Sequence, residues 1–241
     1  MSEQIVYHHD GTALHGLVER PEHWNGAVVL IAHEINGIGV NVRQRATQLA
    51  SRGYLAFVVD HYGEGFYFEG DAARAQMTRL QDDTDLFRGR VRAGFDAALD
   101  VAGVGPDKCA AIGYCFGGQA VLELARSGAP VAGVVSFHGV FGTGRPARPG
   151  EMSAKVLACT GYLDPLVPPA DIAGFQDEMH NAGVDWQLIA YGRAYHAFTN
   201  PNVRGNNGTL AYDASADRQS WAAAMLFIEE ALGLSDASKG G

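Results

Sequence analysis

The chain has 241 residues, of which 47% are hydrophobic and 19% are charged, and its formal net charge is −9 at pH 7. This acidic balance, without any basic run, argues against nucleic acid or an anionic membrane surface as a partner. No apolar run approaches the ~20 residues of a membrane helix, and no N-terminal segment resembles a signal peptide, so we expect a cytoplasmic protein.

Short apolar runs alternate along the chain with longer amphipathic ones. The first runs predict a hairpin, in which Asp10-Gly11-Thr12 turns between strands at 5–7 and 13–18. Further strands are predicted, in chain order, at 27–32, 54–59, 109–112, 131–137, 155–159 and 186–191. Helices are predicted at 41–52, 84–102, 117–127, 169–182 and 215–232.

This alternation is typical of a doubly wound α/β fold, in which helices cover both faces of a mostly parallel central sheet. The predicted strands are continuously apolar rather than alternating, which indicates burial on both faces. The length is sufficient for one large core, so we expect residues 1–241 to form a single α/β domain. The polar segment 235–241 is expected to be a frayed tail.

A glycine-rich hexapeptide around a cysteine follows the strand predicted at 109–112. It reads Gly113-Tyr114-Cys115-Phe116-Gly117-Gly118 and leads into a predicted helix. A side chain at the tip of a sharp strand-to-helix turn requires small residues two positions before and after it, and the helix N-terminus favours a thiolate there. The pattern indicates a nucleophile elbow that carries Cys115. The alternative is an inert cysteine in a glycine-rich turn, because G-x-C-x-G alone is a loose pattern.

Two further residues complete a candidate triad. In an open parallel sheet the ligand site lies beyond the carboxyl ends of the strands, and Asp164 and His196 each follow a predicted strand. The chain order of nucleophile, acid and histidine is that of an α/β-hydrolase triad. Taken singly, Asp164 could instead cap the next helix and His196 could be a polar surface residue.

The chain resembles the dienelactone hydrolase family of α/β-hydrolases over nearly its full length. The resemblance rests on His33-Glu34-Ile35 with Gly37, Asp60-His61-Tyr62-Gly63, the hexapeptide at 113–118, Gly161 with Asp164, and His196-Ala197-Phe198. It implies that Cys115 is the nucleophile, that His196 is the base and acid, and that Asp164 orients His196. It further implies that Glu34 contacts the resting thiol and that the substrates are lactones and related esters.

The physical chemistry of a thiol gives Glu34 a possible function. An ordinary thiol is only a few percent ionised near neutrality, and a neighbouring carboxylate suppresses ionisation further unless it takes the proton itself. We hypothesise that substrate moves Glu34 or shifts its proton affinity, so that the Cys115 thiolate forms mainly in the occupied site. The predicted oxyanion donors are the backbone N–H groups of Phe116 and Ile35. The alternative is that Glu34 is a solvated loop residue.

One position departs from the family. Where well-known members carry an arginine that binds a substrate carboxylate, four residues after the histidine, this chain has Asn200. Arg88, Arg90 or Arg204 are weak candidates for that contact. Tyr62, His138 and Tyr162, which follow predicted strands, are further candidates for substrate binding. The aromatic segment 65–70 is expected to be either a lid or a loop held by packed rings.

The sequence leaves three function classes open. The leading one is a cysteine hydrolase of lactones or small esters, which would bind a small-molecule substrate as a monomer or homodimer. The others are a thiol acyltransferase or thioesterase, and a catalytically weak binding or redox-sensing protein. We expect no cofactor and no metal ion, because His8 and His9 point to opposite faces of one strand. The three cysteines form neither a disulfide framework nor a Cys-x-x-Cys metal pair.

Overall fold

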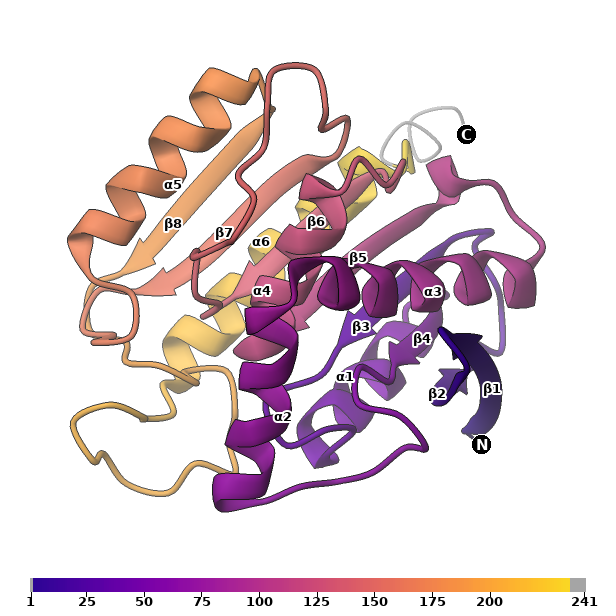
Figure 1. Cartoon of the computed structure of the whole chain (residues 1–241), viewed down its shortest axis with the longest axis horizontal. Coiled ribbons are helices and arrows are strands. Elements are labelled where there is room, and N and C mark those ends of the chain that lie inside the picture. The colour runs from indigo at the N-terminus through magenta and orange to yellow at the C-terminus, as the bar shows by residue number, and fades with distance from the viewer. Residues whose placement is uncertain (1, 235–241) are drawn as a thin grey trace.

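Eight strands form one sheet, in the order β1-β2-β4-β3-β5-β6-β7-β8, in the computed structural model of the chain (Figure 1). The structure describes residues 2–234, so the tail predicted at 235–241 lies outside the described residues. The strands are β1 Glu3–His9, β2 Thr12–Glu19, β3 Val28–Ala32, β4 Leu55–Val59, β5 Cys109–Tyr114, β6 Gly133–Phe137, β7 Lys155–Gly161 and β8 Trp186–Tyr191. The hairpin β1–β2 is antiparallel and joins β4 antiparallel, whereas all pairs from β4 to β8 are parallel.

Helices cover both faces of this sheet. They are α1 Val40–Ala50, α2 Gly70–Asp82, α3 Thr84–Ala102, α4 Phe116–Arg126, α5 Pro169–Ala182 and α6 Ala214–Ala231, with a short 3-10 turn at Pro106–Lys108. Helices α3, α4 and α5 pack on one face, and α1 and α6 pack on the other (Figure 1). Alternate residues of β3 enter the two cores, Leu30 on the α3 and α4 side and Ile31 on the α1 and α6 side. The predicted doubly wound α/β fold is confirmed.

The order of the strands fixes where a site can form. From β3 the chain crosses to β4 on one side, and it later returns to β5 on the other side. The carboxyl ends of β3 and β5 therefore flank a topological switch point, where open α/β sheets bind ligands. Ala32 at the end of β3 pairs in register with Gly113 of β5. Glu34 and Cys115, each two residues further on, consequently leave the sheet side by side.

A buried network of charges holds α4 between α3 and α5. Arg88 of α3 donates from Nε to Glu123 Oε2 at 2.7 Å, and Arg126 donates to Glu123 Oε1 at 3.1 Å. Arg126 also donates to Glu178 Oε2 of α5 at 2.7 Å. Both arginines and Glu123 are buried and have lost their hydration. Each charge is therefore stabilised by its hydrogen-bonded partners instead of by water. The network fixes the helix that begins at the candidate nucleophile.

The aromatic segment before α2 is anchored to the loop after β3. Phe68 N–H donates to the Asn36 carbonyl at 2.8 Å, and the Asn36 side chain returns a bond of 2.8 Å to the Phe68 carbonyl. Phe68 packs against the core, whereas Phe66 and Tyr67 are exposed. This arrangement supports the expectation of a loop held by packing at Phe68.

Candidate active site

Cys115 occupies a sharp turn between β5 and α4. Its backbone has φ 56° and ψ −118°, a conformation that residues with a Cβ rarely adopt. A Cβ at Gly113 would collide with the Gly117 carbonyl, and a Cβ at Gly117 would collide with the Ala32 carbonyl. Glycine is therefore required at both positions for the strand and helix to approach so closely. The local geometry is that of a nucleophile elbow.

His196 and Asp164 form a buried pair. The distance from His196 Nδ1 to Asp164 Oδ2 is 2.8 Å, and Asp164 Oδ1 accepts from Leu166 N at 2.8 Å. Burial alone would lower the pKa of His196, but the negative charge that Cys115 can carry, together with the bond to Asp164, outweighs burial and raises it to about 10. The Cys115 side chain lies close enough to His196 to raise this pKa through a side-chain hydrogen bond as well as through charge, although Nε2 of His196 makes no well-aligned hydrogen bond within residues 2–234. The structure thus brings Cys115, His196 and Asp164 together in the order that a triad requires.

The backbone of His196 is hydrogen-bonded through both of its polar groups. The backbone N–H of His196 donates to the Thr209 carbonyl at 3.0 Å, and the His196 carbonyl accepts from Ala211 N at 3.2 Å. The next residue, Ala197, has a left-handed φ of 58°. The two bonds form an isolated parallel bridge between His196 and Leu210, which holds the imidazole outside the named strands of the sheet.

Glu34 lies beside this group but is held by amides. Asn200 Nδ2 lies 2.9 Å from Oε1 and 3.2 Å from Oε2 of Glu34, and Asn41 Nδ2 donates to Oε1 at 3.3 Å. Burial raises the pKa of Glu34, against the opposing effects of the two asparagines and the cation at His196. In the structure the hydrogen bonds of the Glu34 carboxylate come from these two asparagines, and its contact with the resting Cys115 thiol stays a prediction.

Two backbone N–H groups next to candidate catalytic residues have no acceptor within the described chain. Within the described chain, neither Phe116 N nor Ile35 N donates a hydrogen bond. Tyr62 braces both residues: its hydroxyl donates to the Ile35 carbonyl at 2.8 Å, and its ring stacks on Phe116 with centroids 6.0 Å apart. Burial, and then the negative charge of Cys115, raise the pKa of Tyr62. The predicted oxyanion donors are thus available to a ligand, and the Tyr62 hydroxyl is already bonded within the protein.

Asp60 shapes the loop that carries Tyr62, a function that sequence reasoning did not assign. Its Oδ1 accepts from Tyr62 N and Gly63 N, each at 2.9 Å. Its Oδ2 accepts from His15 N at 2.9 Å and from Gly65 N at 2.8 Å. The position of Asp60 directly after a buried strand was the available signal, because short acidic side chains commonly bond to the backbone of turns.

Three of the predicted substrate contacts are buried in the structure and have protein partners. Arg88 and Arg90 are buried, and they bond to Glu123 and Thr12 respectively, away from the elbow. His138 is fully buried, with one ring nitrogen bonded to Cys115 N and the other to Thr199 Oγ1. Arg88 and both ring nitrogens of His138 are thus bonded within the protein, whereas Nε and Nη1 of Arg90 have no hydrogen-bond partner in the described chain. The sequence could not show this, because each partner is distant along the chain.

Two other predicted contacts are exposed. Tyr162 follows β7 with 69% of its surface accessible, two residues before Asp164. Arg204 is exposed in the loop between His196 and α6. Both therefore remain available to a bound molecule, although neither shares a hydrogen bond with a triad residue.

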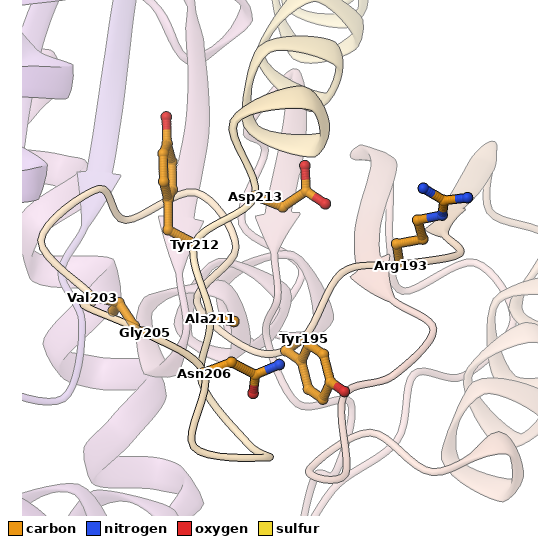
Figure 2. Close-up of a pocket in the computed structure, with 8 residues that line it drawn as sticks. All are labelled: Arg193, Tyr195, Val203, Gly205, Asn206, Ala211, Tyr212 and Asp213. Atoms are coloured by element: carbon orange, nitrogen blue, oxygen red, sulfur yellow. The ribbon is translucent and has the colours of Figure 1, made fainter.

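A cavity of about 300 Å³ opens beside Glu34. It is lined by Glu34, Asn36, Gly37, Gly39, Val40, Asn41, Tyr67, Asn200 and Asn202. No arginine or lysine belongs to this lining. A larger hollow of about 520 Å³ lies between Tyr195 and Tyr212, on the loop that follows β8, and no triad residue lines it (Figure 2). The smaller cavity is likewise not lined by Cys115, Asp164 or His196, but its lining includes Glu34, the fourth candidate residue.

The described residues offer no other obvious chemistry. Across 2–234, no group of three or more His, Cys, Asp or Glu side chains is arranged to hold a metal ion. The three cysteines are free thiols, and burial raises the pKa of both Cys109 and Cys159 to about 12. Over the same range, no helix combines the length and apolarity needed to cross a membrane.

Comparison with known proteins agrees with this geometry. The crystal structure of a dienelactone hydrolase-like promiscuous phosphotriesterase from metagenomic libraries superposes with a TM-score of 0.84 at 32% identity, covering 95% of this chain and 98% of that one. The carboxymethylenebutenolidase of Pseudomonas putida is 26% identical over 228 residues, covering 91% of this chain and 95% of that protein. The sequence model of the dienelactone hydrolase family matches residues 14–232. The chain therefore belongs to the dienelactone hydrolase family.

Proposed function

We propose that the chain hydrolyses lactones or small carboxylic esters through a thioester on Cys115. The observation that carries this proposal is the buried His196, bonded to Asp164 at 2.8 Å, whose pKa is raised to about 10 chiefly by the Cys115 thiolate. A thiolate paired with an imidazolium is the reactive form of a catalytic cysteine. The elbow and the two unused N–H groups supply the remaining requirements of acyl transfer.

Acylation begins when the Cys115 thiolate adds to the ester carbonyl carbon. A C–S bond forms, and the carbonyl electron pair moves to the oxygen, where Phe116 N–H and Ile35 N–H donate to it. Each donor contributes roughly 3 kcal/mol to lowering the barrier. The adduct then collapses: the C–O bond to the leaving group breaks, and His196 gives its Nε2 proton to the departing oxygen. The products are a thioester on Cys115 and a neutral imidazole.

Deacylation reverses the protonation of His196. Water adds to the thioester carbonyl while Nε2 of His196 takes one of its protons, and the same two N–H groups hold the second oxyanion. Collapse breaks the C–S bond and releases the carboxylic acid. The Cys115 thiolate again faces a protonated His196. Throughout, Asp164 keeps the ring oriented and stabilises its positive charge.

The cavity beside Glu34 supports an uncharged substrate. Its side chains include one carboxylate and four asparagines, and no cation that could pair with a substrate carboxylate. Bringing an anion against Glu34 would add repulsion that nothing in this lining compensates. A neutral lactone or ester, with oxygen atoms that accept from the asparagine amides, fits this chemistry. The names of the lactone-cleaving relatives support the same ester class.

A panel of substrates tests the assignment. We would measure hydrolysis of p-nitrophenyl acetate and of two enol lactones that differ only in a carboxylate, using wild type, Cys115→Ala and Cys109→Ala. Turnover by wild type and Cys109→Ala, its loss in Cys115→Ala, and at least about tenfold higher kcat/KM for the neutral lactone are expected. Activity that survives in Cys115→Ala would overturn the mechanism, and a preference for the carboxylated lactone would overturn the assignment of an uncharged substrate.

The same panel separates the other function classes. A thiol acyltransferase would release product mainly when a second nucleophile is added, and a binding or redox-sensing protein would alkylate at Cys115 without turnover. Acid quenching during p-nitrophenyl acetate turnover should trap an acyl group on Cys115, seen by mass spectrometry as a mass increase on that peptide. Turnover with no trapped adduct would contradict the covalent route.

A second candidate activity is the hydrolysis of phosphotriesters. It is supported by the likeness to the promiscuous phosphotriesterase, which covers almost the whole of both chains. The Cys115 thiolate would attack phosphorus, form an S–P bond and displace an aryloxide, with Phe116 N–H and Ile35 N–H facing the phosphoryl oxygen. Water, losing a proton to His196, would then add to phosphorus and break the S–P bond, which releases a phosphodiester and restores the thiolate. Release of p-nitrophenolate from paraoxon, lost in Cys115→Ala, is the expected result.

A further inference from the structure

His138 connects the two halves of the candidate site. The Cys115 N–H is shared between the Phe137 carbonyl at 3.0 Å and the Nδ1 atom of His138 at 3.1 Å. The Nε2 atom of His138 lies 2.8 Å from Thr199 Oγ1. Thr199 follows His196 by three residues on the same loop. One imidazole therefore bonds the backbone of the nucleophile and the loop of the catalytic histidine.

The bonding pattern fixes the protonation of this imidazole. A backbone N–H can only donate, so Nδ1 of His138 must be unprotonated and the ring proton must reside on Nε2. Nε2 then donates to Thr199 Oγ1. A second proton on Nδ1 would point at the Cys115 N–H and break the link. The ring is fully buried and its centroid is 5.2 Å from that of His196.

The groups around His138 keep it neutral. Burial lowers its pKa well below the usual value, and the positive charges of His196 and Arg45 lower it further. Tyr114 and Phe198 supply the other rings against it. The two histidines of the site therefore differ. In the proposed mechanism His196 gains and loses a proton at Nε2, whereas His138 stays neutral with its proton on Nε2.

Thr199, the residue that His138 bonds on the loop of His196, is itself held by a second contact. Arg45 of α1 donates from Nη2 to the Thr199 carbonyl at 2.8 Å and pairs with Asp217 of α6. Its guanidinium lies over the ring of Trp221, 5.1 Å from the centroid. The loop that carries His196 is therefore tied to the helices behind the sheet as well as to the elbow. A displacement of Thr199 is resisted from both directions.

We propose that His138 is a positioning residue, which sets the separation of Cys115 Sγ and His196 Nε2 by bonding the elbow at Nδ1 and the histidine loop at Nε2. Cys115 and His138 both have positive φ angles, 56° and 41°, which are unfavourable for residues other than glycine. Such conformations persist only where surrounding contacts impose them. The inference rests on the proposed function, because it assigns the geometry of the same cysteine and histidine. His138 touches neither substrate nor the reacting atoms.

A conservative pair of substitutions at Thr199 tests the link. Thr199→Val keeps the shape of the side chain and removes the acceptor, whereas Thr199→Ser restores it. We expect Thr199→Val to lower kcat for p-nitrophenyl acetate roughly five- to tenfold with KM unchanged within twofold. We further expect the midpoint of the pH profile for alkylation of Cys115 by iodoacetamide to rise, because the thiolate loses a well-placed imidazolium. Thr199→Ser should restore both quantities.

Thr160→Val is the matched control. Thr160 is as fully buried as Thr199, and its hydroxyl has no hydrogen-bond partner in the described chain. The same substitution there removes no bond, so kcat and the alkylation midpoint should stay at wild-type values. A role of Thr199 in stability alone would lower the melting temperature without moving the alkylation midpoint of the folded protein. Thr199→Val behaving like Thr160→Val would overturn the proposal.

His138→Asn provides a second test. The Asn side-chain oxygen superposes on Nδ1, and Asn tolerates a positive φ, so the bond from Cys115 N–H is kept while the bond to Thr199 is lost. Its kcat should fall as in Thr199→Val, and combining the two substitutions should cause no further loss. Fully additive losses would overturn the route through the His138–Thr199 bond. If wild type alkylates but does not turn over, the hydrolase proposal fails and the alkylation midpoints alone decide the positioning proposal.

Discussion

Asn200 donates to both carboxylate oxygens of Glu34, at 2.9 and 3.2 Å. The position that holds a cationic clamp in well-known relatives therefore holds an amide that fastens the neighbouring carboxylate. An amide hydrogen bond stabilises the charged form far less than an ion pair does. As a result, burial prevails and raises the pKa of Glu34. The candidate site keeps a carboxyl group that accepts a proton more readily than an exposed glutamate.

The raised pKa of Glu34 predicts a pH-dependent gain in stability for Glu34→Gln. The folded chain holds this proton to higher pH than the unfolded chain, so the wild-type carboxyl group costs stability as pH rises above its unfolded pKa. Below that pKa both states are protonated and the cost vanishes. The melting temperature of Glu34→Gln, relative to wild type, should therefore be higher at pH 8 than at pH 4.5. The exposed Glu22→Gln should show no such difference, and an equal difference in both variants would contradict the prediction.

Cys115→Ser should lower the pKa of His196 from about 10. Its elevation depends first on the thiolate charge, which serine does not carry, so burial would then be opposed by Asp164 alone. The titration of the His196 ring protons can be followed by NMR and assigned with His196→Gln. In Cys109→Ala, where a thiol buried in β5 is lost, the midpoint should stay in place. A midpoint unmoved in Cys115→Ser would show that Cys115 is not ionised beside His196.

Gly113→Ala should disrupt the elbow. Its Cβ would collide with the Gly117 carbonyl, a backbone atom that cannot move aside as a side chain can. We expect a loss of about 3 kcal/mol or more in the free energy of unfolding, measured by urea denaturation. Gly174→Ala is the control, because Gly174 lies on α5 with open space around its Cβ position. That substitution should stabilise by roughly 0.5–1 kcal/mol, and similar losses at both positions would contradict the steric argument.

Glu123→Ala should destabilise strongly without touching the site. It leaves the guanidinium groups of Arg88 and Arg126 buried beside an absent carboxylate. Breaking a buried ion pair from one side costs about 3–5 kcal/mol, again measurable by urea denaturation. Glu3→Ala removes a partner of Arg20 from an exposed pair, and it should cost less than about 1 kcal/mol. Equal costs for the two variants would contradict the assignment of the network as a buried one.

The sequence predicts the scaffold well where a pattern is local. The continuous apolar runs identify every strand of the sheet, and the helix predicted at 169–182 coincides with α5 Pro169–Ala182. Helix α2 Gly70–Asp82 escapes prediction for a physical reason. It is rich in polar residues and buries only Ala73 and Leu80, so too few apolar side chains mark it as a helix of the core. Its place in the fold depends on packing against α3 rather than on a core of its own.

The site is less predictable than the scaffold. The order of Cys115, Asp164 and His196 along the chain is visible because each follows a strand. Partners that are set by folding are not visible: the Asn200 amide reaches Glu34 across 166 residues of sequence. For the same reason Arg88, read as a free cation from the sequence, bonds to Glu123 of another helix. A local sequence pattern shows which candidate functional side chains are present. Only the fold shows which of these side chains are already hydrogen-bonded to other protein groups.

The parallel order of the sheet has a consequence for the newly synthesised chain. The elbow on β5 leaves the ribosome well before β8 and the loop that fastens His196 to Thr209 and Ala211. Until that loop docks, no imidazolium faces Cys115, and an ordinary thiol is mostly protonated near neutral pH. A nascent or truncated chain therefore carries a weakly reactive cysteine. In the proposed mechanism the thiolate–imidazolium pair therefore requires the loop after β8, which is among the last parts of the chain to be synthesised.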